Sequence, residues 1–330
     1  MEFRELGNTG LRVSALGLGT SHFGESPRYR REIFGFGRQL FGRADSTTDF
    51  KSCKRCLDTA LGVGINFIDT SPYYGLTQSE TMLGRTLIGV PRERYLLATK
   101  IGRYGNNPSD FDFSANRVTR SVNESLSRLG IEYVDIIQCH DVEFGDLNQI
   151  VEETIPALRE VVKTGKARFI GVTGLPLKVF LNVLSRTQVD TILSYCHYSL
   201  NDTSLETLLT PLAEKNIGII SASPFSMGLL TQNGLPGWHP APDAIKTACR
   251  RAVEHCHSKA ISIEKLAIQF ATSNPRIATT LMGTNSAAHI ENNARWLEEP
   301  LDEELLREVE EILAPIKNQT WPSGRIENNH

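Results

Sequence analysis

Four side chains that can move or stabilise a proton follow apolar runs in the first half of the sequence. Asp69 ends one such run, and Tyr74 follows it by five residues across a Pro/Gly turn. Lys100 and His140 each end a later apolar run. Runs rich in β-branched and aromatic residues predict strands, so each of these side chains would lie near the C-terminal end of a strand. If the strands are neighbours, the four side chains form a site.

These residue types together suit proton transfer to or from an oxygen atom. A tyrosine has a reference pKa of about 10, so we expect Lys100 to lower the pKa of Tyr74 and Asp69 to keep Lys100 charged and oriented. His140 can hydrogen-bond the carbonyl or carbinol oxygen of a substrate. Proton transfer at oxygen accompanies hydride transfer at the attached carbon, which requires a nicotinamide cofactor. The alternative for each residue alone is structural: a turn cap, a solvated lysine or a rim histidine.

Composition excludes several other classes of function. The chain is 40% hydrophobic and 22% charged, with a net charge of -3, which suits a globular protein and argues against a nucleic-acid partner. It has no apolar run of about 18 residues and no apolar segment near its N-terminus, so we expect a cytoplasmic protein without a membrane partner. The six cysteines fit no disulfide framework, and Cys53 and Cys56 are interpreted as helix residues. No serine or cysteine nucleophile or metal-ligand spacing is evident, so we expect no metal.

Apolar runs and helical patterns alternate along the chain after a short hairpin predicted within residues 3–13. The predicted strands are 14–19, 65–69, 95–100, 133–140, 167–173, 191–196, 217–222 and 277–283. The predicted helices are 51–62, 78–88, 114–129, 151–164, 176–186, 204–215, a longer region 243–274, 287–297 and 302–314. Continuous apolar strands, each followed by a helix, predict an α/β protein: an eight-stranded parallel β/α (TIM) barrel with extra C-terminal helices.

A doubly wound sheet is the alternative fold. It would need a Gly-rich phosphate turn after the first strand, and the stretch 17–24 lacks G-x-G-x-x-G spacing. We therefore expect residues 1–330 to form a single barrel domain. In such a barrel the C-terminal strand ends build the active site, which would place all four proton-handling residues at one rim.

These residues resemble the tetrad of the aldo-keto reductase superfamily, and longer stretches resemble it as well. The matching stretches are 6–11, 66–75, 99–104, 139–145, 171–176, 193–198, 221–224 and 317–324. The resemblance implies a barrel that binds a nicotinamide cofactor across its strand ends, with a catalytic tetrad made of Asp69, Tyr74, Lys100 and His140. More narrowly, these stretches resemble the plant members that oxidise L-galactose at C1 with NAD, giving L-galactono-1,4-lactone on the route to ascorbate.

Several alternatives stay open within this resemblance. The substrate could be another aldose, such as L-fucose or D-arabinose, because discrimination between sugars depends on a few hydrogen bonds. The protein could also be an NADP-dependent aldehyde or ketone reductase, or a nicotinamide-binding sensor or channel subunit. The resemblance implies a small sugar substrate and is compatible with a monomer or a homodimer.

The same resemblance indicates how the cofactor would be held. Relatives that use NADP place a lysine and an arginine around the 2′-phosphate, where this sequence has Gly283 and His289, so NAD is favoured. Asn292 and Asn293 match positions that hold the adenine. The predicted cofactor residues are Gly19, Thr20, Asp69, Thr173, Ser194, Ser221, Ala222, Ser223, Pro224, Gly228, Gly283, Thr284, Asn285, His289, Asn292 and Asn293.

Two features at the nicotinamide end are less regular. Thr173 and Ser194 match positions that contact the nicotinamide amide, although a shift of one residue would give this role to Tyr195. Ala222 stands where the family often stacks an aromatic ring, so another group would have to cover the cofactor.

The segment 25–43 is a predicted insertion after the first barrel strand. It contains five arginines and three phenylalanines but only two glutamates. One interpretation is a solvated loop. The other is a lid that folds aromatic side chains over a sugar.

Overall fold

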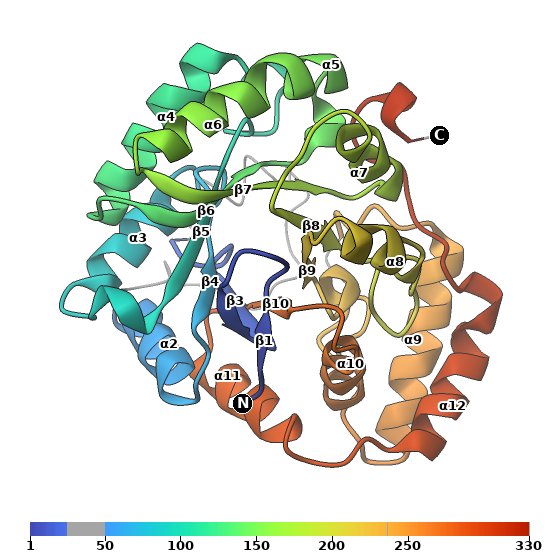
Figure 1. Ribbon diagram of the computed structural model, residues 1–330. Helices are drawn as coiled ribbons and strands as arrows, with labels where there is room; N and C mark the ends of the chain where they lie inside the picture. The colour runs from blue at the N-terminus through green and yellow to red at the C-terminus, as the bar shows by residue number, and fades with distance from the viewer. Residues whose placement is uncertain (25–49, 236, 330) are drawn as a thin grey trace.

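The computed structural model describes residues 1–24, 50–235 and 237–329. Eight parallel strands close into a barrel, in which β10 pairs with both β3 and β9 (Figure 1). The barrel strands are β3 Leu16–Gly19, β4 Phe67–Asp69, β5 Leu96–Ile101, β6 Val134–Cys139, β7 Ala167–Gly174, β8 Thr191–Tyr195, β9 Gly218–Ala222 and β10 Thr279–Gly283. The predicted barrel is confirmed, and the doubly wound alternative is wrong because the sheet closes on itself.

The predicted N-terminal hairpin is also present. Strands β1 Phe3–Glu5 and β2 Arg12–Ser14 pair antiparallel. Leu6, Leu11 and Val13 share a buried apolar cluster with barrel residues such as Phe67 and Ala98. The hairpin therefore covers one end of the barrel, opposite the end where the candidate site lies.

Helices surround the barrel (Figure 1). They are α2 Phe50–Gly62, α3 Gln78–Leu87, α4 Ala115–Leu129, α5 Leu147–Gln149, α6 Ile155–Lys163, α7 Leu177–Leu184, α8 Glu206–Glu214, α9 Asp243–Ser258, α10 Ile263–Thr272, α11 Ala287–Trp296 and α12 Glu303–Leu313. Short helical turns are η1 Arg92–Arg94, η2 Pro108–Asp110, η3 Val142–Phe144, η4 Ile150–Thr154, η5 Ser226–Gly228, η6 Ala314–Ile316 and η7 Ile326–Asn328. Within the described ranges, no helix is long and apolar enough to cross a membrane.

Two predicted helices differ in detail from the structure. The region 243–274 contains two helices, because the chain turns between them with Ala260 at φ 56°. The helix predicted over 151–164 begins earlier, with α5 at Leu147, and continues through the π-helical turn η4 into α6. Pro156 lies at the start of α6 and has no backbone N–H, so it cannot make the α-helical bond to the preceding turn. The predicted insertion 25–43 lies outside the described residues.

Alternation along the strands decides which side chains face the barrel interior. One buried cluster lies inside the barrel and contains Phe67, Ala98, Ile136, Leu193 and Ile220. The residues next to these belong to the cluster under the helices: Ile68, Leu97, Ile137, Ile192 and Ile219. Successive side chains on a strand point to opposite faces. The side chains two positions further along β4, β5 and β6 therefore point inward at the C-terminal strand ends: Asp69, Lys100 and Gln138.

Candidate active site

The structure brings Asp69, Tyr74 and Lys100 into direct contact. The ammonium of Lys100 donates to a carboxylate oxygen of Asp69, to the backbone oxygen of Thr70 at 2.8 Å and to the hydroxyl of Tyr74 at 3.3 Å. Lys100 is only 1% exposed and Asp69 only 2%, so the alternative of a solvated lysine is excluded. Because β4 and β5 are neighbours, the two strand ends place this ion pair inside the barrel.

Gln138 holds the other carboxylate oxygen of Asp69. Its amide nitrogen donates to Oδ2 at 2.9 Å from β6, which is separated from the β4 strand of Asp69 by β5. Burial raises the pKa of Asp69, whereas Lys100 and Gln138 act in the opposite direction. Gln138 is one of the site residues that the sequence analysis missed, since nothing in a single apolar run marks which polar side chain faces a neighbouring strand.

Tyr74 keeps its proton more strongly than the sequence analysis expected. Burial, followed by the carboxylates of Asp69 and Asp141, raises the pKa of Tyr74 well above its usual value. Lys100 lies beside the Tyr74 hydroxyl, as predicted. The predicted lowering of the Tyr74 pKa is wrong, because its pKa is raised. The phenol is therefore a proton donor at neutral pH.

His140 stands beside Tyr74, with the two rings edge to face and their centroids 5.7 Å apart. Its Nδ1 lies 3.0 Å from the hydroxyl of Ser71, which also accepts the backbone N–H of Tyr73 at 3.1 Å. The Ser71 hydroxyl can donate to Nδ1, and in that arrangement the ring proton lies on Nε2. Burial lowers the pKa of His140 to about 3, so the imidazole is neutral. A neutral ring with a proton on Nε2 can donate a hydrogen bond to a substrate oxygen.

An ion pair between Arg103 and Asp141 adjoins His140, and the sequence analysis missed it. Nη1 of Arg103 donates to Oδ2 of Asp141, and the same oxygen lies 3.7 Å from Nε2 of His140. The Arg103 guanidinium lies 3.9 Å from the ring centroid of Tyr73. Both charged residues fall within stretches that carried the family resemblance, but their pairing joins two separate loops and cannot be read from either one.

The C-terminal tail reaches this end of the barrel through Glu143. Oε1 of Glu143 accepts hydrogen bonds from the backbone N–H of Leu175 at 3.1 Å, from Ser323 at 3.0 Å and from the hydroxyl of Tyr195 at 3.3 Å. Burial, with the nearby charge of Asp141, raises the pKa of Glu143 to about 8. Figure 1 shows the tail running from α12 towards α7, where the chain ends.

The predicted residues at the nicotinamide end divide into inward and outward positions. Ser194 and Ser221 alternate with inward-facing neighbours, so they point towards the helix layer, and neither hydroxyl has a hydrogen-bond partner among the described residues. Tyr195 points inward instead, which favours the one-residue shift. The hydroxyl of Thr173 accepts the backbone N–H of Asp141 at 2.9 Å, so it orients that residue.

Small residues line the adjoining strand ends. Gly19, Ala222 and Gly283 end the neighbouring strands β3, β9 and β10, and a Cβ at Gly19 would meet backbone atoms of β10 at 3.4 to 3.7 Å. Ser223 follows with φ 61°. The remaining predicted residues at these strand ends are Thr20, Pro224 and Gly228. The hydroxyl of Thr20 donates to the backbone oxygen of Asp69 at 3.0 Å, and Pro224 and Gly228 lie in the loop after β9. Glycine and alanine, the two smallest residues, thus end three neighbouring strands on this side of the barrel.

The predicted adenosine residues lie on and before α11. Thr284 and His289 approach each other, with 3.2 Å between Oγ1 and Nδ1, while Gly283, Asn285 and His289 are exposed. Asn292 is half-buried. Asn293 is different, because it is 4% exposed and its amide nitrogen contacts the sulfur of Met282 at 2.9 Å. Asn293 therefore faces the core below the helix.

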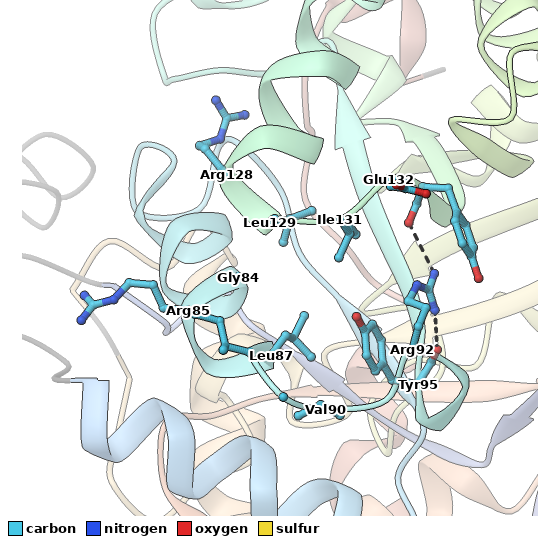
Figure 2. A pocket seen from close by; sticks show the side chains of 14 residues that line it. Gly84, Arg85, Leu87, Val90, Arg92, Tyr95, Arg128, Leu129, Ile131 and Glu132 are labelled. Carbon is cyan, nitrogen blue, oxygen red and sulfur yellow. Dashed lines mark hydrogen bonds between the residues drawn. The ribbon is translucent and has the colours of Figure 1, made fainter.

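A surface pocket of about 520 Å³ lies at the opposite end of the barrel. Figure 2 shows Arg92 with hydrogen bonds to the backbone oxygens of Tyr95 and Tyr133. Arg92 also pairs with Asp135, and Arg128 pairs with Glu80. These arginines support the fold, and the pocket lies near the N-terminal strand ends, which serve stability in such barrels.

Comparison with known proteins agrees with this geometry. Residues 33–314 match the model of the aldo/keto reductase family. The chain is 49% identical to L-galactose dehydrogenase of Arabidopsis thaliana over 99% of each chain, and 32% identical to D-arabinose 1-dehydrogenase of Saccharomyces cerevisiae over 65% of this chain and 67% of that protein. The solved holo form of an aldo-keto reductase from Bacillus halodurans superposes with a TM-score of 0.75 and 25% identity, covering 100% of each chain. The present chain therefore belongs to the aldo/keto reductase family.

Proposed function

We propose that this protein is an NAD-dependent aldose 1-dehydrogenase that oxidises L-galactose at C1 to L-galactono-1,4-lactone. The contact of Lys100 with both the Asp69 carboxylate and the Tyr74 hydroxyl carries this proposal, because it supports proton transfer through Tyr74 at the barrel mouth. The 49% identity to an L-galactose dehydrogenase over nearly the whole chain supports the choice of sugar. Family membership implies a nicotinamide cofactor.

Each residue of the tetrad has a distinct part in the proposed reaction. In the oxidation, Tyr74 reacts as the phenolate and accepts the proton of the C1 hydroxyl, and Lys100 stabilises that phenolate before the transfer. Asp69 pairs with Lys100 and orients its ammonium within the buried site. Nε2 of His140 donates to the same substrate oxygen and fixes its position. The bound nicotinamide cofactor supplies the hydride acceptor.

The residues at the adenosine end support NAD over NADP. Gly283 and His289 stand where relatives that use NADP carry a lysine and an arginine. A Cβ at position 283 would lie 3.1 Å from the hydroxyl of Ser21 and 3.2 Å from Nδ1 of His22, so a longer side chain would be crowded there. Without the arginine, a 2′-phosphate loses its bidentate partner.

One observation favours a second candidate, an NADP-dependent aldehyde or ketone reductase. The raised pKa of Tyr74 makes it a proton donor at neutral pH, which is the role that reduction of a carbonyl group requires. The exposed glycine and histidine at the adenosine end argue against the phosphorylated cofactor, so we keep reduction as the alternative.

The test is the absorbance of the reduced nicotinamide, measured with purified protein, NAD or NADP, and four sugars in parallel. We expect rapid NAD reduction with L-galactose and slower reaction with L-fucose, D-arabinose and D-galactose. Activity with NADP alone, or turnover only of aldehydes with reduced cofactor, would replace the proposal with the reductase. No turnover, with cofactor binding intact, would favour a sensor or channel subunit.

A further inference from the structure

The Arg103–Asp141 pair is unusual because it combines a buried charge with a strained backbone. Asp141 is 4% exposed and has φ 49°, in the left-handed region that few residues other than glycine adopt. A buried ion pair contributes little net stability, because removing both charges from water opposes their attraction. Backbone strain of this kind accumulates at functional sites, where the surrounding structure holds it. The fold therefore tolerates two unfavourable features directly beside His140.

The surroundings fix the carboxylate in one place. The Thr173 hydroxyl accepts the Asp141 N–H at 2.9 Å and lies 3.3 Å from Oδ1, while Arg103 donates to Oδ2. A carboxylate has about four acceptor positions, so capacity remains for a ligand on both oxygens. Burial opposes ionisation of Asp141, but its neighbour His140, followed by Arg103 in direct contact, keeps its pKa below the usual value. Asp141 is thus a fixed, charged hydrogen-bond acceptor.

Aromatic rings enclose the other partner of the pair. The Arg103 guanidinium lies 3.9 Å from the ring centroid of Tyr73, 5.2 Å from that of Phe144 and 5.4 Å from that of Phe111. Its side chain is 17% exposed, so it still reaches the mouth. Hydrogen bonds from a charged group are stronger when water is excluded. A ligand oxygen at this pair would therefore be held tightly and in one orientation.

The distance from this pair to His140 selects the kind of ligand. Oδ2 of Asp141 and Nε2 of His140 are 3.7 Å apart. Two ligand oxygens that bind these two groups from the same side lie close together, as oxygens on adjacent carbons do. Nε2 donates to one oxygen, and the carboxylate accepts the hydroxyl proton of the other. The two groups thus complement a hydroxyl next to an oxygen-bearing reacting carbon.

We propose that Asp141, held by Arg103, binds the hydroxyl on the carbon next to the reacting carbon, so that the site selects aldoses with a free 2-hydroxyl group. This inference rests on the proposed function, in which C1 of an aldose reacts beside His140. It assigns to Asp141 and Arg103 a role in substrate specificity that is separate from proton transfer by the tetrad.

The decisive experiment compares L-galactose with its 2-deoxy and 6-deoxy forms, the latter being L-fucose. We expect loss of the 2-hydroxyl to lower kcat/KM of the wild-type protein about 10- to 100-fold, the effect of one hydrogen bond to a charged group. In Asp141→Asn, the difference between L-galactose and its 2-deoxy form should shrink to a few-fold, while the ratio between L-galactose and L-fucose stays as in the wild type. The deoxy sugar has the same intrinsic reactivity with both proteins, so this reactivity cancels when the sugar ratio of Asp141→Asn is compared with that of the wild type.

Asp135→Asn is the matched control. Asp135 is, like Asp141, a buried carboxylate paired with arginine, but it lies on β6 at the opposite end of the barrel. This variant should lose stability and keep both sugar ratios. If Asp141→Asn does not fold, Arg103→Lys and the wild-type sugar series still test the idea, since Arg103→Lys should reduce the 2-hydroxyl preference.

Three outcomes are distinguishable. Turnover of L-galactose and its 2-deoxy form at similar rates by the wild type would overturn the inference and leave the proposed function standing. A preference that survives in both Asp141→Asn and Arg103→Lys would also overturn it. Failure of the wild type to oxidise any aldose would overturn the proposed function and this inference with it.

Discussion

The hydroxyl of Ser323 lies 3.0 Å from Oε1 of Glu143, so the C-terminal tail is hydrogen-bonded to a carboxyl group beside the candidate active site. The side chain of Asn328 adds two bonds, from its amide to the backbone oxygens of Glu143 at 2.8 Å and Gly145 at 3.1 Å. Glu143 also accepts a bond from Tyr195, whose ring faces the barrel mouth. The tail and the site are thus joined through one buried residue.

Glu143 should make stability fall as the pH rises. Its pKa is about 8 in the folded protein and near 4.5, the ordinary value, when unfolded. Between these values the folded state holds a proton that the unfolded state has lost, so each pH unit lowers the free energy of unfolding by up to about 1.4 kcal/mol. Below pH 4.5 both states are protonated and this effect is absent.

Replacing Glu143 with glutamine should remove this pH dependence. The difference in free energy of unfolding between Glu143→Gln and the wild type should shift in favour of the variant as the pH rises from 5.5 to 8. Denaturant unfolding at both pH values measures this difference. Glu160→Gln on α6, where the side chain is 67% exposed, serves as the control and should follow the wild type. A constant difference between Glu143→Gln and the wild type across this range would show that Glu143 is ionised in the folded protein.

Gly324 allows the tail to approach the backbone of Glu143. It has φ +71°, and a Cβ there would lie 2.3 Å from the backbone oxygen of Glu143. Gly324→Ala should therefore displace the tail, lower the free energy of unfolding and raise KM for the sugar.

Gly10→Ala is the control for the backbone conformation. Gly10 has φ +68° but nothing within 4 Å of its Cβ position, so it reports the conformational effect alone. We expect Gly324→Ala to lose about 1 to 3 kcal/mol more than Gly10→Ala in urea unfolding, the usual range for an overpacked site. Equal losses would mean that the tail moves aside freely.

Tyr74→Phe should remove most turnover and leave cofactor binding unchanged. General acid–base catalysis contributes about 100- to 10,000-fold, so kcat for oxidation should fall by at least about 100-fold. Because the pKa of Tyr74 is raised, little phenolate exists at neutral pH, and the wild-type oxidation rate should increase with pH. This increase should be absent in Tyr74→Phe.

Steady-state kinetics between pH 6 and 10, with fluorescence titration of the cofactor, would test both statements. Tyr133→Phe, near the N-terminal strand ends, is the control and should keep the wild-type profile. Retention of wild-type turnover in Tyr74→Phe would assign the proton transfer to another group.

His289→Arg should improve the use of NADP. His289 is exposed on α11 at the predicted 2′-phosphate position, and an arginine there could bind a phosphate in bidentate fashion. We expect kcat/KM for NADP to rise about 10- to 100-fold, with little change for NAD. Adding Gly283→Lys to this variant should raise kcat/KM for NADP by a smaller factor than His289→Arg does, because Ser21 and His22 crowd that position. His257→Arg, exposed on α9, is the control; an equal gain there would point to overall charge.

The sequence by itself determined the barrel and the residue types of the tetrad. Strand and helix periodicity are local properties, so eight apolar runs with intervening helices were enough to predict the closed sheet. Because parallel strands end at one rim, Asp69, Lys100 and His140 could be placed together from their positions at strand ends. The two helices within 243–274 were merged because the turn at Ala260 carries no glycine or proline signal.

Only the tertiary structure decided which groups contact one another and what charge they carry. The Arg103–Asp141 pair and the bond between Ser323 and Glu143 join segments that no local pattern relates. The raised pKa of Tyr74 depends on burial and on the carboxylates of Asp69 and Asp141, which outweigh the opposing charge of Arg103. Register and side-chain direction likewise decide that Tyr195 faces the mouth and Ser194 does not. Such contacts and burial depend on the packing of segments that are distant in the chain, so they cannot be read from local patterns in the sequence.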